Sequence, residues 1–371
     1  MNLDKQYPIL IKLLSPFRRS QQKTCLAVVS ALLEAAQANT FQIAAKLSVQ
    51  SRVGLPSAVN RFYRFLRNER FDNWLLTERL FSFFADRKRI ILSLDWTSWG
   101  ERFSVLTASI AVEKRSLPVA VSAVKKRELA RSQNLWEETF LRLCVDRLKA
   151  ARVKAIWLCD RGFHRVAWLG ALKTLKQDFV VRLQKDVMVE RGGEKRLLKS
   201  LSFAQGEYRD YGFVRLRVDG KVKVRLIGVW AAESKEIWWL ATNLKLSVAE
   251  IVGLYDRRMS IEEQFRDTKG TRFGVKLKWT QFEKGEYLER MYLLVGLAML
   301  VWTSVGRFVE RTKPQVRMQC KKKGARLSLV RIGILFFAEV KKTLRLTTKF
   351  IKANLPLPKV RIFNWLAVHQ K

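Results

Sequence analysis

Residues Tyr255 to Gly270 read Tyr-Asp-Arg-Arg-Met-Ser-Ile-Glu-Glu-Gln-Phe-Arg-Asp-Thr-Lys-Gly. This stretch has no Gly or Pro before its last residue, and Ser247 with Glu250 three positions later forms a capping-box pattern upstream. We therefore expect one helix that begins after Ser247 and ends near Gly270. Each residue of such a helix turns by about 100°. Five side chains then share one face, namely those of Tyr255, Arg258, Glu262, Arg266 and Lys269.

This face has two interpretations. Ion pairs four residues apart, from Arg258 through Glu262 to Arg266, are common on a solvated helix surface. Alternatively, Glu262 is a functional carboxylate that shares its face with a phenol and cations, whereas Glu263 and Asp267 point elsewhere. Two further carboxylates in the chain favour the second interpretation.

Two buried strands are expected to end in an aspartate. Ile90–Asp95 and Lys154–Asp160 are nearly continuous apolar runs that finish with an acid, a pattern typical of buried strands. Taken singly, an Asp at such a place often only caps the following turn or helix. If the two strands are neighbours, however, Asp95 and Asp160 lie side by side, and a later helix can add the carboxylate of Glu262.

The order of the expected elements indicates an α/β fold with a ribonuclease-H-like catalytic core. Three consecutive strands are followed by helix, strand, helix and strand, which gives an antiparallel start and a parallel continuation. After the first strand, these elements are expected at Phe103–Val112, Leu117–Val121, Asn134–Lys149, Lys154–Asp160, from about Arg165, and at Phe179–Leu183.

An all-β insertion is expected between about residues 186 and 240. Alternating runs are separated there by Gly192-Gly193 and by Asp219-Gly220, and such dipeptides predict hairpins. Trp230, Trp238 and Trp239 form a dense aromatic end, for which packing in the core is the simplest explanation.

Residues 1–85 are expected to form a helical DNA-binding domain. The segment Ser57–Asn68 carries an arginine at every third position beside an apolar stripe. We expect Phe62, Phe65 and Leu66 to pack inward. The arginines then either face solvent or bind DNA phosphates, which fixes the register on DNA but not its sequence. These arginines are Arg61, Arg64 and Arg67.

The composition favours a nucleic-acid partner. The 371 residues contain 71 Lys and Arg against 33 Asp and Glu, a formal net charge of +38, and this excess calls for a polyanion. A membrane surface is the rival, but no basic amphipathic anchor stands out. The apolar run Met291–Val305 is short for a membrane span and is expected to be a buried helix. With 12 Trp and 22 Phe, the apolar core is too large for a ribosomal or DNA-packing protein.

Zinc is not expected as a cofactor. The four cysteines are widely spaced, and His164 and His369 are the only histidines. His164 follows Asp160 closely and is expected to be structural or to contact DNA. Thiols without a signal peptide suggest a reducing, cytoplasmic location.

The spacing of Tyr255, Arg258, Glu262 and Lys269 resembles the Y-R-E-K signature of bacterial insertion-sequence transposases, the cut-and-paste group with a DDE catalytic triad. The resemblance extends strongly from about residue 90 to about residue 274. Met259 departs from it, since many relatives have Trp there. Other matching blocks are Asp95 with Trp96-Thr97-Ser98, Asp160 with Arg161-Gly162-Phe163, Trp239–Leu244 and Ile261–Arg266.

The resemblance implies that Asp95, Asp160 and Glu262 are catalytic and hold two divalent cations, with Asp95 as the shared ligand. Carboxylate oxygens suit Mg²⁺ or Mn²⁺. It also implies DNA-binding roles at two positions in particular. Lys269 would hold a phosphate of the transposon end, and Trp238 would stack near a flipped base. The remaining DNA-binding residues on the same segment would be Tyr255, Arg258 and Arg266.

The implied protein is a transposase that binds terminal inverted repeats and target DNA, and that pairs two ends as a homodimer on the nucleoid. The catalytic domain would span residues 86–310. A basic region at 311–371, with Arg311, Lys313 and Lys321–Lys323, would serve dimerisation or DNA contact. Two alternatives remain open, a structure-specific metal-dependent nuclease on the same fold and a catalytically idle DNA-binding derivative.

Overall fold

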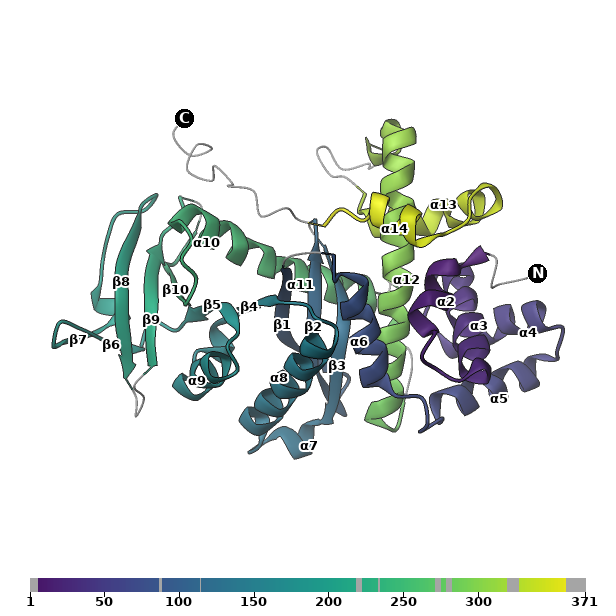
Figure 1. Cartoon of the computed structure of the whole chain (residues 1–371), viewed down its shortest axis with the longest axis horizontal. Coiled ribbons are helices and arrows are strands. Elements are labelled where there is room, and N and C mark those ends of the chain that lie inside the picture. The colour runs from purple at the N-terminus through teal and green to yellow at the C-terminus, as the bar shows by residue number, and fades with distance from the viewer. Residues whose placement is uncertain are drawn as a thin grey trace.

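One large sheet runs through the molecule (Figure 1). The computed structural model describes residues 6–86, 89–113, 115–217, 222–232, 234–270, 275–277, 282–318 and 327–357. Within these residues, ten strands form one sheet in the order β3-β2-β1-β4-β5-β10-β9-β8-β6-β7. The protein is therefore a mixed α/β fold, as the sequence predicts.

The first half of the sheet contains the five expected strands. β1 (Ile90–Trp99), β2 (Phe103–Val112) and β3 (Arg115–Lys125) are antiparallel, whereas β4 (Ala155–Cys159) and β5 (Asp178–Leu183) continue parallel to β1. The prediction that the first strand ends at its aspartate is wrong. Pairing with β4 stops one residue before Asp95, but pairing with β2 continues to the end of β1, because β2 is long enough to stay beside it.

The expected β insertion extends the same sheet. β6 (Met188–Arg191) and β7 (Glu194–Leu197) form a hairpin around two glycines with positive φ, Gly192 and Gly193. β8 (Tyr208–Arg217) and β9 (Val222–Val229) pair antiparallel, while the expected Asp219-Gly220 turn between them lies outside the described residues. β10 (Trp238–Thr242) joins β9 to β5. The central sheet and the insertion are thus continuous.

Helices cover both faces of the central strands and one end of the sheet. Figure 1 shows α12 between the central strands and the N-terminal helices, with the strands of the insertion at the opposite end. The helices are α2 (Pro8–Leu14), α3 (Arg19–Ala35), α4 (Thr40–Ser51), α5 (Leu55–Leu66), α6 (Asn73–Phe83), α7 (Lys126–Leu129), α8 (Gln133–Ala150), α9 (Val166–Thr174), α10 (Val248–Asp256), α11 (Ser260–Lys269), α12 (Gly285–Thr312), α13 (Leu329–Thr343) and α14 (Thr348–Asn354).

The two faces of the sheet pack against different helices, because successive side chains of a strand point to opposite sides. Ile91, Ile156 and Leu158 lie in a buried cluster with residues of α10. Leu94 and Trp157 belong instead to the larger core, which also contains apolar residues of α8 and α9. By the same alternation, Asp95, two positions after Ser93 on β1, is directed to the α10 face. Asp160, two positions after Leu158, is directed to that face as well.

The single helix expected after Ser247 is broken. Its start is confirmed, since Ser247 and Glu250 form the expected capping box. α10 ends at Asp256, however, and a 3-10 turn at Arg257–Met259 precedes α11. This tighter turn shifts the angular positions of all later residues, because a 3-10 helix has fewer residues per turn. The side chain of Arg258 within the turn is almost fully buried.

α12 is the buried apolar helix expected around Met291–Val305. By length and composition alone it is apolar enough to cross a membrane, but 89% of its apolar window is buried inside the protein. It packs along β3, and α13 and α14 pack against it. Its hydrophobic length is therefore explained by its place in the core.

Candidate active site

Asp95 and Asp160 lie side by side at the ends of two paired segments. The parallel strands β1 and β4 pair through Leu94 and Cys159, and the residue that follows each of these two is an aspartate. The Oδ1 atom of Asp95 accepts a hydrogen bond from the backbone N–H of Trp96 at 2.8 Å. The Oδ1 atom of Asp160 accepts one from Gly162 at 2.8 Å, so this residue also caps the turn that follows β4.

Glu262 reaches the same place from α11, and Arg258 lies between the acids. The guanidinium Nη1 of Arg258 is 3.3 Å from Oδ2 of Asp95, while its Nη2 pairs with Oε1 of Glu262. The Arg258 side chain is 8% exposed and that of Glu262 is 43% exposed. The structure thus brings Glu262 and Asp95 to one buried cation, with Asp160 beside them.

The electrostatics of Asp95 show how closely these groups interact. Burial raises the pKa of Asp95 to about 6, and the nearby Asp160 adds to the rise. Arg258 and the Trp96 N–H lower this pKa, whereas Glu262 raises it further. The charges of Asp160 and Glu262 therefore both affect the pKa of Asp95, and a cation bound among the three carboxylates would reduce their repulsion.

The carboxylates of Asp95, Asp160 and Glu262 are suitable ligands for a divalent cation, but in this structure they are not close enough together to bind one. Carboxylate oxygens are preferred by Mg²⁺ and Mn²⁺. Among the described residues, however, no three His, Cys, Asp or Glu side chains are close enough to hold an ion. The guanidinium of Arg258 stands between Asp95 and Glu262. A metal bound by both residues would require this guanidinium to leave.

Lys269 contacts the strand that carries Asp95. Its Nζ donates to Oγ1 of Thr97 and, at 2.8 Å, to the carbonyl oxygen of Ser98. Arg266 lies one turn after Glu262 on α11, so the two side chains start from the same face of that helix. It pairs with Glu263 at 2.7 Å, however, and its side chain is 71% exposed. Of the alternative ion-pair ladder, the pair of Arg258 with Glu262 is therefore present, whereas Arg266 has Glu263 as its partner.

Tyr255 and Trp238 pack against each other beside the acids. Their rings meet edge to face at 5.4 Å between centroids, and the guanidinium of Arg182 lies 5.8 Å from the Trp238 ring. Tyr255 is 2% exposed, and burial raises the pKa of its phenol, so it stays a hydrogen-bond donor. A phosphate could reach the phenol only after this packing opens.

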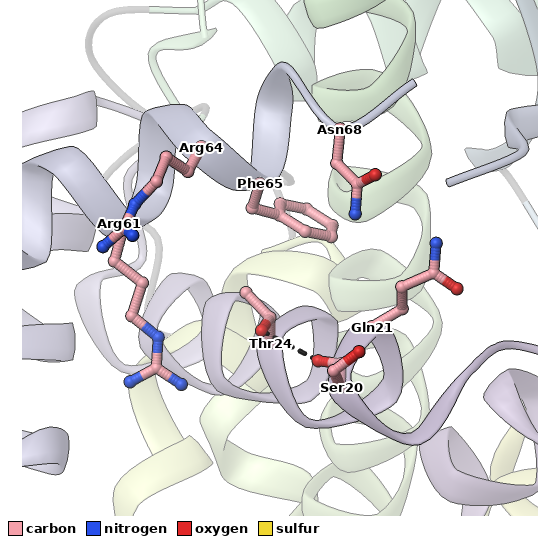
Figure 2. Close-up of a pocket in the computed structure, with 7 residues that line it drawn as sticks. All are labelled: Ser20, Gln21, Thr24, Arg61, Arg64, Phe65 and Asn68. Carbon is pink, nitrogen blue, oxygen red and sulfur yellow. Dashed lines mark hydrogen bonds between the residues drawn. The ribbon is translucent and has the colours of Figure 1, made fainter. Parts of the chain in front are cut away.

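The arginines of α5 face away from the core. Phe62, Phe65 and Leu66 are buried, as expected. Arg61 donates to Oγ of Ser51 at 2.9 Å, and the guanidinium of Arg67 lies 5.8 Å from the Tyr63 ring. Figure 2 shows a pocket of about 340 Å³ between α3 and α5, and none of the described residues that line it is acidic. They are Ser20, Gln21, Thr24, Arg61, Arg64, Phe65 and Asn68.

Other expected residues have local roles or fall outside the described chain. His164 contacts the carbonyl oxygen of Arg161 through Nδ1 at 2.8 Å. Lys313 of the basic C-terminal region pairs with Glu339 at 2.8 Å, and Arg311 donates to the carbonyl of Ala353 at 3.2 Å. His369 and Lys321–Lys323 lie outside the described residues.

One buried acid near the site, Glu137, was not predicted from the sequence. Glu137 on α8 accepts hydrogen bonds from the side chains of Trp96 and Arg165, the first of which directly follows Asp95. The sequence contains a signal for this burial. Glu137 lies three positions before Phe140 and four before Leu141, which places it on the apolar face of α8. An acid at such a position needs a buried partner.

Comparison with known families agrees with this geometry. Residues 86–299, more than half of the chain, match the family model described as the transposase DDE domain. The chain belongs to this transposase family. As a DDE transposase it is an enzyme that acts on DNA, and divalent metal ions are the cofactors of its family. No curated protein matches the chain.

Proposed function

We propose that this transposase binds the terminal inverted repeats of a bacterial insertion sequence, cleaves the DNA there and joins the 3′ ends to target DNA. The observation that carries the proposal is the adjacency of Asp95 and Asp160 on parallel strands, with Glu262 directed to them from α11. The strand order β3-β2-β1-β4-β5 supports a ribonuclease-H-like core over residues 86–310.

The three acids would act as metal ligands. Two divalent cations, Mg²⁺ or Mn²⁺, supply activation of the attacking oxygen and stabilisation of the leaving oxygen when bound. Asp95 is influenced by both other acids, which supports its assignment as the shared ligand. Asp160 and Glu262 would each complete one site.

Arg258 would change partners when DNA binds. Without DNA its guanidinium neutralises Asp95 and Glu262. A backbone phosphate is an equally good bidentate partner for a guanidinium. Transfer of Arg258 to a phosphate would then leave both acids to the metal ions, and Lys269 is close enough to the Asp95 strand to hold a neighbouring phosphate.

Residues 1–85 would dock the DNA by charge. Arg61 and Arg64 line the pocket between α3 and α5 (Figure 2). Arg67 follows as the C-cap residue of α5, and its side chain is exposed. Guanidinium groups of this kind bind phosphates and set the register of the protein on DNA. Two subunits would pair the two ends, and the C-terminal region from 311 to 371 would serve this dimer or contact DNA.

The test is substitution of each acid by alanine. Loss of Asp95, Asp160 or Glu262 removes metal-dependent stabilisation worth several kcal/mol, so strand cleavage should fall about a thousandfold or more. End binding should persist, because these groups serve the chemistry. Asp256→Ala is the matched control, since this acid is exposed on the same segment, and it should cleave normally.

The assay uses paired end sequences and scores binding, cleavage and strand transfer separately. Transfer products identify a transposase, cutting without joining identifies a nuclease, and binding alone identifies an idle derivative. Wild-type cleavage by any of the three alanine variants would disprove the assignment of the acids.

A further inference from the structure

A buried carboxylate lies behind the two aspartates. Glu137 comes from α8, and its side chain is 1% exposed. Its Oε1 accepts hydrogen bonds from Nε1 of Trp96 at 2.7 Å and from Nε2 of Gln133 at 2.8 Å, and its Oε2 pairs with Nη2 of Arg165. Three donors therefore satisfy one carboxylate in the core.

The first donor connects Glu137 to Asp95. Adjacent residues of a strand point to opposite faces, so Trp96 is directed to the α8 side while Asp95 is directed to the α11 side. The Trp96 backbone N–H also donates to Oδ1 of Asp95. Fixing the indole through Glu137 thus fixes the peptide group that orients the Asp95 carboxylate.

Arg165 connects Glu137 to the loop after β4. Asp160 begins this loop and caps its 3-10 turn, and Arg165 ends the loop as the residue before α9. The ion pair between Arg165 and Glu137 is shielded from solvent on the carboxylate side. Glu137 therefore anchors the loop that determines where the Asp160 carboxylate stands.

The contacts of Glu137 with Trp96 and with Arg165 both act on the separation between Asp95 and Asp160. Asp95 and Asp160 are like charges at neighbouring positions, so their carboxylates repel each other. Pairing of β1 with β4 ends at Leu94 and Cys159, and beyond that point the contacts of Glu137 with Trp96 and Arg165 hold the two segments from the α8 side. Groups that orient metal ligands typically change metal affinity or activity by about 10–100-fold when they are removed.

We propose that Glu137 is a positioning residue that holds the segments of Asp95 and Asp160 at the separation needed to bind divalent cations. The proposal rests on the proposed function, because it requires that these two aspartates are metal ligands. Glu137 itself faces away from the reaction and touches neither DNA nor metal.

The experiment replaces the carboxylate without changing its volume. Glu137→Gln loses the charge that pairs with Arg165 and turns an amide N–H₂ toward other donors. Mn²⁺ is titrated into the full chain bound to a DNA duplex, and free Mn²⁺ is followed by electron paramagnetic resonance. We expect Mn²⁺ affinity to fall about 10–100-fold while DNA affinity stays unchanged.

Glu78→Gln is the matched control. Glu78 on α6 pairs with Arg147 of α8 at 3.2 Å, so this change removes an ion pair of the same helix away from both aspartates. Mn²⁺ affinity should then equal that of the wild type. If Glu137→Gln binds Mn²⁺ as the wild type does, or if both variants lose affinity equally, Glu137 has no specific positioning role.

A second variant covers the case in which Glu137→Gln fails to fold. Trp96→Phe removes the indole N–H donor together with part of the ring system, but it keeps an aromatic ring in the core, and it should also weaken Mn²⁺ binding. Unchanged Mn²⁺ affinity in a folded Trp96→Phe protein would overturn the proposal. If the wild type itself binds no Mn²⁺ that Asp95→Ala abolishes, the proposed function fails instead, so the two failures are distinguishable.

Discussion

Trp238 and Trp239 are neighbours on β10, and their rings lie on opposite faces of the sheet. Trp239 is 3% exposed and packs against Phe203 and Tyr211, whereas Trp238 is half-buried against Tyr255 beside the candidate active site. The sequence predicts this division from the alternation of strand side chains alone. The role of Trp238 toward a flipped base remains a prediction.

Substitution of each tryptophan by alanine should give different defects. Trp239→Ala should lower the free energy of unfolding by about 3–5 kcal/mol, as for other buried aromatics. Trp238→Ala should slow the step after first-strand nicking, because stacking on an aromatic offsets the cost of unstacking by about 1–3 kcal/mol per base. Single-turnover assays and urea unfolding measure the two effects. A Trp238→Ala protein that unfolds early but nicks and completes cleavage normally would identify Trp238 as a core residue only.

Glu289 predicts a pH dependence of stability that is separate from the candidate catalytic acids. Its Oε1 accepts the Ala123 backbone N–H at 2.8 Å, but burial raises the pKa of Glu289 to about 7. The folded protein therefore holds this proton more tightly than the unfolded chain does. The corresponding stability is present below the ordinary Glu pKa of about 4.3 and is lost as the pH rises through about 7.

Glu289→Gln should remove this loss. Its free energy of unfolding relative to the wild type should increase between about pH 5 and pH 7, by at most about 1.4 kcal/mol per pH unit. Urea unfolding at several pH values measures both proteins. Parallel stability profiles would show that the pKa of Glu289 is the same in the folded protein and in the unfolded chain.

At the scale of elements, α12 and α13 approach each other through glycines. A Cβ atom at Gly306 would overlap the carbonyl oxygen of Leu329, and one at Gly333 would overlap that of Trp302. These obstacles are backbone atoms, which cannot swing aside as a flexible side chain does. The crossing of the two helices therefore depends on glycine at both positions.

Gly306→Ala should lower the free energy of unfolding by about 1–3 kcal/mol through overpacking, despite the better helix propensity of Ala. Gly170→Ala in α9 is the control, since its Cβ would meet only Val222 Cγ2 at an ordinary 3.7 Å. That change should stabilise the protein by about 0.5–1 kcal/mol. Thermal or urea unfolding compares them, and equal effects at the two positions would show that the α12–α13 contact can adjust.

At the scale of the whole molecule, the positive charge and the continuous core act together. One hydrophobic cluster contains buried residues of the N-terminal helices, of the central strands and of α12, so these elements share the larger core. Arg290 of α12 reinforces this junction by donating to the carbonyl oxygens of Phe65, Leu66 and Phe71. If the α5 arginines bind DNA as proposed, this junction would hold the DNA at a defined place relative to the three acids.

The net charge of +38 predicts strongly salt-dependent DNA binding. Neutralisation of several phosphates should lower affinity about a thousandfold between roughly 50 and 200 mM salt. Fluorescence anisotropy of a labelled duplex over this range measures the slope. A flat response would mean that the charge serves a partner other than DNA.

The sequence by itself predicted the strand and helix order, the capping box at Ser247, the burial of α12 and the inward face of α5. These features follow from local periodicity and capping, which depend on neighbours in the chain. It also predicted that Asp95 and Asp160 become adjacent if their strands are neighbours, and the parallel pairing of β1 with β4 meets that condition.

Tertiary structure alone decided three features of the site. The 3-10 turn joins α10, which packs on β5, to α11, which packs on β1 to β3, and it changes the angle between Tyr255 and Glu262 around the helix axis. Arg258 turns inward, where it pairs with Asp95 and Glu262. Glu137 of α8 accepts a hydrogen bond from Trp96 of β1, 41 positions apart in sequence. Long-range charge pairing of this kind depends on which elements meet in space, and no local pattern contains that information.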